Sequence, residues 1–304
     1  MAKVLNLFDF TKAELPDVLF QLKVHQKDLD QKIYKAAEHF LTIEDQSDEI
    51  QKGDIVAVKV NSKDPMLCSD CDRFNLGKGF YSEEIEDALL GKKTGDTISA
   101  KMADSPVEVT VLWHKRRIVP ELTDDMAARL GLEDVSTRAE YDAYAFAELE
   151  EEDKEKKQNA IWLMVSKQLV EKSTFELDPS EIENQFIKDM SYLQAELGED
   201  FAEFMKAKFH GKTMEECQQK YREEIDKTLK LCAIAEPMVE EEDVHFTEDD
   251  YNAMIESMMS DEYTEEELKQ SMSYGDYVKM QLEEYLKASI LAYFDDRFTT
   301  TLVE

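Results

Sequence analysis

Two cysteines three positions apart, Cys68 and Cys71, are the residues whose spacing most resembles a chemical motif. A Cys-x-x-Cys pair can act as a redox couple at the start of a helix, or can supply half of a zinc site. Here the pair lies in the loop segment NSKDPMLCSDCD, and the sequence contains no second Cys-x-x-Cys and no His-x₃₋₅-His motif to complete four ligands. We therefore interpret the pair as incidental and expect neither a bound metal nor another cofactor.

The other reactive side chains form no catalytic pattern. The five histidines are scattered, no G-x-S-x-G elbow marks a nucleophile, and the sequence has neither a G-x-x-x-x-G-K-[ST] phosphate loop nor a G-x-G-x-x-G segment. The acidic runs 148–153, 240–243, 248–250 and 265–267 could present a calcium surface, but they lack the alternating spacing of a calcium loop. We interpret these acidic runs as solvated helix faces. Because the sequence has no phosphate loop, we also expect no dependence on ATP.

The hydrophobic pattern around these residues changes twice along the chain. Apolar residues at intervals of three and four predict a helix from Glu14 to about Leu41. Between residues 51 and 118, alternating segments predict four or five strands and one short helix, 82–90, with Ser82 as its N-cap. After Pro120 we expect only helices, at 123–131, 137–172, 178–197, 201–209, 214–235, 247–259, 264–272 and 274–298. The predicted class is α+β: a small antiparallel sheet domain with one short helix, and an extended all-α domain with helical arms.

Charge divides the chain near Pro120. Residues 1–119 carry 17 basic and 21 acidic side chains, a net charge of −4, whereas residues 120–304 carry 19 and 48, a net charge of −29. We therefore expect an N-terminal segment with a linker helix (1–45), a strand-rich domain (46–119) and a helical domain (120–304). The total of −33 disfavours nucleic acids and anionic membranes as partners. We expect no transmembrane or signal segment, and four cysteines in 304 residues are too few for a disulfide framework, as is typical of cytoplasmic proteins.

Several stretches resemble the trigger factor family. GDIVAVKV is similar to the first strand of its FKBP-type prolyl isomerase domain, and LGKGFYSEEIEDALLGKKTGD is similar to that domain's glycine-rich segment. VPELTDDMAARLGLEDVSTRAEYDA resembles the joint to the C-terminal helical domain, and FELDPSEIENQF resembles its proline-opened arm helix. The resemblance covers about residues 14–300 and implies a chaperone for unfolded or nascent polypeptide. Because only about 45 residues precede the isomerase-like part and no basic G-F-R-x-G-x-x-P loop is found, we expect no ribosome docking by the family's route.

The same resemblance implies the position of the prolyl pocket. In the family, aromatic rings enclose the substrate proline and a backbone N–H holds the neighbouring carbonyl, a role that falls to Ser82. The aligned pocket positions are Val60, Phe74, Tyr81, Ser82, Ile85 and Val107. Aliphatic residues at three of them offer little of the flat contact that aromatic rings give a proline ring. We predict that isomerase activity is weak or absent.

Methionine and aromatic residues are frequent after Pro120, and 11 of the 14 methionines lie there. Many must pack helix against helix, and the remainder are expected to line a concave surface rimmed by carboxylates. Methionine adapts to differently shaped partners, as promiscuous binding surfaces require. The residues expected to contact clients are Tyr144, Trp162, Phe186, Met190, Phe204, Met205, Met254, Met258, Tyr277 and Tyr285.

Two other functions stay open. The isomerase-like domain could be active with a rearranged pocket, which the activity of fragment 46–119 would test. The acidic helices could instead form a fixed interface of a scaffold or assembly protein for one partner, in which case a pull-down would recover one stoichiometric protein. Either a monomer or a dimer is compatible with the sequence.

Overall fold

The computed structural model describes residues 2–260 and 263–304. Its helices are α1 (Gln26–Glu38), α2 (Glu83–Leu89), α3 (Asp124–Arg129), α4 (Arg138–Lys172), α5 (Pro179–Leu197), α6 (Phe201–Phe209), α7 (Met214–Glu241), α8 (Glu248–Met258), α9 (Glu265–Ser271) and α10 (Tyr274–Phe294). Its strands are β1 (Lys3–Asn6), β2 (Gln21–His25), β3 (Thr42–Gln46), β4 (Ile55–Ser62), β5 (Ser69–Asn75), β6 (Thr97–Met102), β7 (Ser105–Ile118), β8 (Thr174–Glu176) and β9 (Thr299–Val303). The α+β class predicted from the sequence is confirmed, but the expectation of only helices after Pro120 is wrong, because β8 and β9 are strands that pair with β1 and β2.

The chain forms two compact units. The helical unit contains the chain up to Lys23 together with Glu151–Thr301, and the sheet unit contains Val24–Glu150 and Leu302–Glu304. The division falls within α4. The domain boundaries expected from the sequence, at 45/46 and 119/120, remain predictions.

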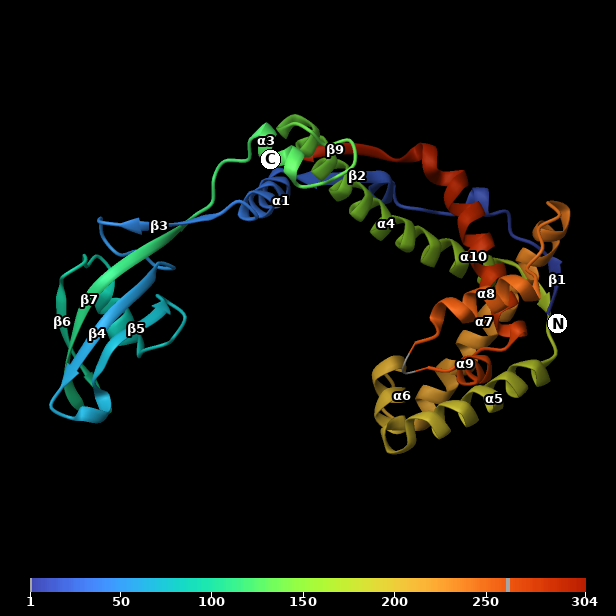
Figure 1. Cartoon of the computed structure of the whole chain (residues 1–304). Coiled ribbons are helices and arrows are strands. Elements are labelled where there is room, and N and C mark those ends of the chain that lie inside the picture. Colours follow the sequence, from blue (N-terminus) through green and yellow to red (C-terminus); the bar gives the residue numbers. More distant parts are fainter. Residues whose placement is uncertain (1, 261–262) are drawn as a thin grey trace. The chain divides into compact units, whose positions relative to one another are not determined.

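The sheet unit is built on a five-stranded antiparallel sheet. Its strand order is β3-β7-β4-β5 (Figure 1). Strand β3 pairs with the C-terminal part of β7, and β6 pairs with the N-terminal part. In the centre Val60 is opposite Val109, and Val58 is opposite Val111. The β-branched residues of these strands pack against α2 in a core that contains Ile50, Val56, Val58, Val60, Phe74, Leu76, Ile85, Leu89, Ile98, Val107, Val109 and Val111. A second cluster of the same unit, around Leu29, Ala37, Leu122, Ala127 and Tyr141, joins α1, α3 and the first turns of α4.

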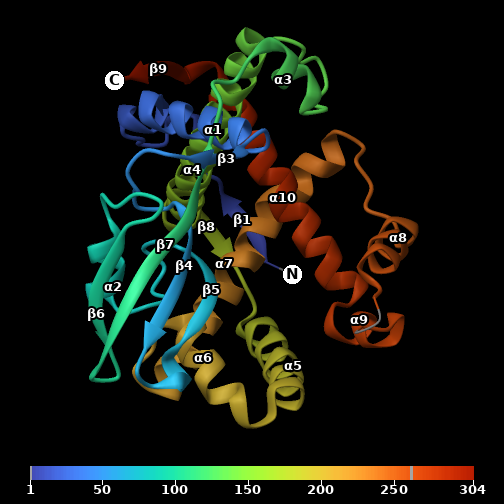
Figure 2. The ribbon, with the colours of Figure 1, turned by 60° about the vertical axis from the view of Figure 1, so that its left-hand side comes forward.

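The helical unit is held by a core between α4, α7 and α10. Ile161, Val165, Leu231, Leu286 and Ile290 are fully or almost fully buried there. Helix α10 packs against α7, and α5 and α6 pack against another part of α7 (Figure 2). The ends of α5 follow the predicted signals: Asp178 caps its first turn through the Ser180 N–H, Pro179 is its first residue, and Gly198 ends it.

The predicted helix over 14–41 is wrong in its first half. Residues 21–25 form strand β2, in which Leu22 and Val24 are buried and their neighbours are exposed. This alternation has the period of a strand, and it competes with the helical spacing of the same apolar residues. The helix itself begins only at Gln26.

Helix α7 and the start of the chain also differ from simple expectations. Helix α7 continues past Pro237 to Glu241, whereas the sequence predicted an end at 235. Val239 is buried in the core beyond the proline, and this packing offsets the hydrogen bond that proline cannot donate. Near the start of the chain, Val4 and Leu5 lie in strand β1, which pairs with β8 of the helical unit.

Candidate functional site

The residues aligned with the prolyl pocket lie mostly inside the sheet unit. Val60, Ile85 and Val107 are at most 2% exposed, and Phe74 is also buried. Ser82 is exposed at the start of α2. The half-buried Tyr81 donates its hydroxyl hydrogen to the Asp72 carboxylate, and its ring lies edge-on to Phe74. Burial and then this hydrogen bond raise the pKa of Tyr81, so its hydroxyl stays protonated at neutral pH.

A cavity of about 290 Å³ opens beside these residues. Of the six aligned positions only Tyr81 lines it, together with Lys52, Leu76, Gly77, Gly79, Glu83, Glu86, Asp87 and Leu90. The buried Glu86 carboxylate accepts backbone N–H groups from Gly77 at 2.6 Å and Tyr81 at 3.0 Å, which fixes the glycine loop. Burial alone would raise the pKa of Glu86, but these N–H groups hold it below its ordinary value. The cavity therefore has a polar wall made of loop backbone and carboxylates.

The structure distributes the predicted client-contacting residues over separate clusters. Phe186, Met190 and Met205 are buried between α5, α6 and α7, with Phe204 half-buried beside them. Tyr277 is buried among α8, α9 and α10, next to the half-buried Met254. Trp162 and Tyr285 are half-buried against the main helical core, and Tyr144 belongs to the sheet unit. Met258 is the most accessible of the ten, at 45%.

Two adjoining cavities lie between α5, α7 and α10, and we call them together the groove. They have volumes of about 310 Å³ and 530 Å³, and they share Gln185, Leu229 and Lys279. The larger has an apolar wall formed by Leu229, Cys232, Ala233, Val278 and Leu282. The smaller adds Ile225 and Met280, and carboxylates such as Glu283 stand beside them.

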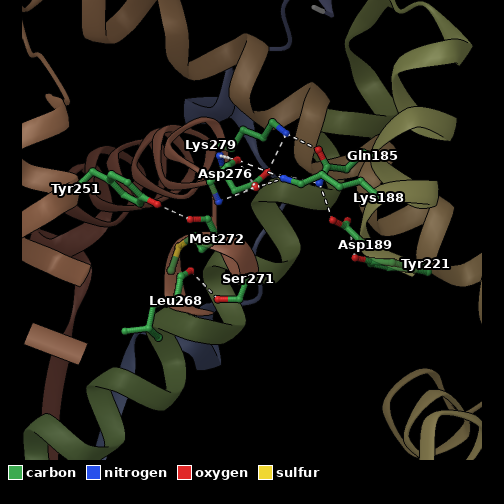
Figure 3. A network of polar contacts seen from close by, with 11 residues as sticks. Gln185, Lys188, Asp189, Tyr221, Tyr251, Leu268, Ser271, Met272, Asp276 and Lys279 are labelled. Carbon is green, nitrogen blue, oxygen red and sulfur yellow. Dashed lines mark hydrogen bonds and ion pairs between the residues drawn. The ribbon is translucent and has the colours of Figure 1, made fainter. Parts of the chain in front are cut away.

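Polar side chains from the three helices form a network along the groove (Figure 3). Lys188 of α5 pairs with Asp276 at the start of α10. Lys279 donates to the Gln185 side-chain oxygen at 2.7 Å and also pairs with Asp276 at 3.4 Å. The side-chain NH₂ group of Gln185 donates to the Asp189 carboxylate at 2.8 Å, and this carboxylate also accepts a hydrogen bond from the Tyr221 hydroxyl at 2.7 Å. These bonds fix the relative positions of α5, α7 and α10 within the helical unit.

The pKa values of the titratable side chains in the groove are shifted in different directions. Burial alone would raise the pKa of Asp276, but hydrogen bonds from Lys188 and Ser273, and the charges of Lys188 and Lys279, hold it well below the usual range. Burial raises the pKa values of Glu236 and Glu283, with the Glu240 carboxylate adding to the effect at Glu236 and the Lys227 charge opposing it at Glu283. Burial also raises the pKa of the Cys232 thiol to about 12, so this cysteine is a small apolar wall residue at neutral pH.

We expect Asp276→Asn to lower the free energy of unfolding by about 1–2 kcal/mol at pH 7, because it removes a partly buried ion pair and the capping carboxylate of α10. The folded-state pKa of Asp276 is lowered, so its contribution is present above its ordinary value of 3.8 and is lost as the pH falls further. Urea unfolding of both proteins at pH 7 and pH 3 measures this. Asp226→Asn, which breaks only an i,i+4 pair with Lys230, is the matched control and should cost about 0.5 kcal/mol or less. Equal losses in the two variants at pH 7 would contradict the role given to Asp276.

Sequence reasoning missed most of the groove. Two residues of its apolar wall, Cys232 and Ala233, come from the stretch LCAIA (231–235), where five consecutive apolar or small residues indicate a helix that is buried on more than one side. Its polar network is marked by the capping box of Ser273 and Asp276. Neither signal involves a methionine or an aromatic residue, which are the residue types from which the client contacts were predicted.

The segment of the thiol motif is only partly a loop, because Cys71 lies in strand β5. Cys68 and Cys71 are free and exposed, and the Cys68 thiol bonds weakly to the backbone carbonyls of Ser62 and Asp64. Within 2–260 and 263–304, no group of three or more His, Cys, Asp or Glu side chains is arranged to hold a metal ion. Over the same residues, no helix combines the length and the apolar character needed to span a membrane.

Fold and site together define an α+β protein whose helical unit carries an apolar groove with a charged edge. Residues 138–293, just over half of the chain, match the family described as bacterial trigger factor protein (TF) C-terminus, and the chain belongs to the trigger factor family. This stretch includes all three helices that line the groove.

Individual relatives are distant. The trigger factor of Streptococcus mutans is 25% identical over 84% of this chain and 65% of its own length, and that of Levilactobacillus brevis is 23% identical over 84% and 64%. The trigger factor of Agathobacter rectalis is 24% identical over 60% of this chain and 44% of its own. The chain thus spans about half to two-thirds of these relatives. A solved structure from work on promiscuous substrate recognition in the folding and assembly activities of the trigger factor chaperone covers 96% of this chain and 72% of its own, with 16% identity and a TM-score of 0.47.

Proposed function

We propose that this protein is an ATP-independent cytoplasmic chaperone that binds unfolded polypeptide in the groove between α5, α7 and α10. The observation that carries the proposal is the cavity of about 530 Å³ with an apolar wall, whose lining residues all lie in the family-matched part of the chain except Ala2. Leu229 and Val278 are only half-buried, and the small Ala233 and Cys232 stand beside them. Such a wall can accept apolar side chains of different shapes without a fixed complementary pocket.

The polar edge of the groove supports the same role. Lys188 and Asp276 are 47% and 24% exposed at their side chains, so they can also contact a client's backbone. The half-exposed Met280 adds a flexible apolar contact beside them. The net charge of −33 opposes self-association, which helps to keep a complex with an aggregation-prone client in solution.

The direct test is aggregation of a chemically denatured protein that is diluted into buffer without nucleotide. We expect this chain to suppress light scattering at molar ratios near one, since the groove is already formed in the free protein. No suppression at a severalfold molar excess would contradict the proposal. A pull-down that recovers one stoichiometric partner instead of many unrelated proteins would favour a scaffold.

We further propose that the sheet unit is a peptide-binding or structural module with little or no prolyl isomerase activity. Three aliphatic core residues stand at aligned pocket positions, and the Tyr81 hydroxyl is engaged with Asp72. We expect the rate of isomerisation of a prolyl tetrapeptide, measured without a coupled protease, to stay within about twofold of the uncatalysed rate, whose barrier is ~18–20 kcal/mol. An ordinary FKBP domain at equal concentration is the positive control. Comparable turnover by this chain would show that the pocket is active.

A further inference from the structure

The segment 3–19, which we call the strap, lies on the helical unit without forming an α-helix. Strand β1 pairs with β8 in antiparallel register, with Val4 opposite Phe175. Further along, Phe8, Phe10, Leu15 and Leu19 pack against the core between α4, α7 and α10. The strap therefore binds this surface as a bound peptide would, with strand pairing at 3–6, two 3₁₀ turns that begin at Phe10 and Asp17, and apolar side chains spaced along its length.

Side chains at the C-terminal end of α4 hold the backbone of the strap. The Phe8 N–H donates to the Ser173 hydroxyl at 3.0 Å. The Glu14 N–H donates to the Gln168 side-chain oxygen at 3.0 Å, and the Gln168 amide group donates back to the Glu14 carbonyl at 3.1 Å. Every residue except proline offers these same backbone groups. The contacts of Gln168 and Ser173 are therefore independent of the sequence that they bind.

The strap is held less firmly than the chain that follows it. No side chain from 3 to 19 is fully buried, and Leu5, Leu7 and Val18 are 58%, 48% and 55% exposed. Directly afterwards, Phe20 and Leu22 are 4% and 3% exposed. Weakly buried contacts are the first to open locally, so the strap can leave the surface while Phe20 keeps its place.

The strap also leads to the groove. Ala2, the residue before it, lines the larger cavity together with residues of α5, α7 and α10. The surface beneath the strap and the groove are therefore continuous within the helical unit.

We infer that the surface of the helical unit beneath residues 3–19 is a second site for client polypeptide that is not α-helical, occupied by the chain's own strap until a client displaces it. Its ligand is a segment with apolar side chains two positions apart, as in Phe8 and Phe10, and with free backbone N–H and C=O groups. The inference rests on the proposed chaperone function and adds to it a contact that limits client binding. With a competing strap, the apparent association constant for a client equals the intrinsic constant multiplied by the fraction of molecules in which the surface is open.

The test uses the full chain and a fluorescein-labelled peptide with the sequence of residues 3–19. Phe8→Ser with Phe10→Ser weakens the strap and leaves the surface beneath it unchanged. We expect this double variant to bind the peptide at least about fivefold more tightly than the unsubstituted chain, because the open fraction rises. Val18→Ser, which alters an exposed side chain of the strap, is the matched control and should leave the affinity unchanged. Adding Gln168→Ala and Ser173→Ala to the double variant should remove most of the gain.

Hydrogen exchange of residues 3–16 reports whether the strap has been released. Faster exchange in the double variant without tighter peptide binding would overturn the inference, and so would unchanged exchange, since Phe8 and Phe10 would then not be what holds the strap. These readouts do not depend on aggregation suppression. Failure of the unsubstituted chain to suppress aggregation would instead count against the proposed function.

Discussion

A chain with Met280→Glu and Leu229→Ser should lose most of its ability to keep a denatured protein from aggregating. Both side chains line the groove, and neither is fully buried, so the substitutions change the groove more than the core. Losing two apolar contacts and gaining a carboxylate should weaken client binding by about 2 kcal/mol. Because 1.4 kcal/mol corresponds to a factor of ten, half-maximal suppression should need more than about tenfold more chaperone.

The matched control is Met66→Glu, which places the same new charge on a 90% exposed methionine of the sheet unit. It lies outside the groove and should leave aggregation suppression unchanged. Circular dichroism of both variants checks that the helices are intact. Equal suppression by the groove variant and the control would place client binding elsewhere on the molecule.

The second large effect concerns the sheet unit. Replacing Arg116 by alanine should lower its free energy of unfolding by about 3 kcal/mol or more, because Asp54, which is 2% exposed, would lose its charged partner. Arg116 donates to both oxygens of Asp54 at 2.9 Å and also pairs with Asp48. Trp113 on β7 reports this unfolding by fluorescence, provided that Trp162 is replaced by phenylalanine in all proteins compared.

The matched control and the pH dependence make this prediction specific. Lys59→Ala removes an exposed pair with Asp70 and should cost about 0.5 kcal/mol or less. Burial alone would raise the pKa of Asp54, but Arg116 holds it below its ordinary value of 3.8. The stabilisation is therefore present above that value and is lost as the pH falls further, and Arg116→Ala should abolish this loss. A cost below about 1 kcal/mol would show that the pair does not determine the stability of the sheet unit.

Much of the fold could be predicted because its signals are local. Thr123 caps α3 and Gly131, at φ +72°, follows its end, so both ends of this helix lie where the sequence placed them. The glycine-bounded segments between residues 51 and 118 gave the short helix α2 and the main strands of the sheet. Strand β3 was missed, since its five residues are largely exposed and it joins the sheet only by pairing with β7, which is distant in the sequence.

The site was harder to predict because helical spacing identifies a face but not what covers that face. Met205 and Met258 have the same side chain on amphipathic helices, yet the first is fully buried between α6 and α7 and the second is 45% exposed. Ala233 and Cys232 matter in the groove because they are small, which leaves space that only the packing of α5 and α10 reveals. The aligned prolyl pocket shows the same limit, since the Tyr81 hydroxyl, in the loop before α2, donates to Asp72 of strand β5.

Site-specific crosslinking tests the central claim most directly. A photoreactive amino acid at position 280, in the groove, is compared with the same group at position 66, on an exposed part of the sheet unit. During incubation with a permanently unfolded client and without nucleotide, we predict strong crosslinking from position 280 and little from position 66. Equal yields at the two positions, or a yield only at position 66, would contradict the assignment of the groove as the client-binding site.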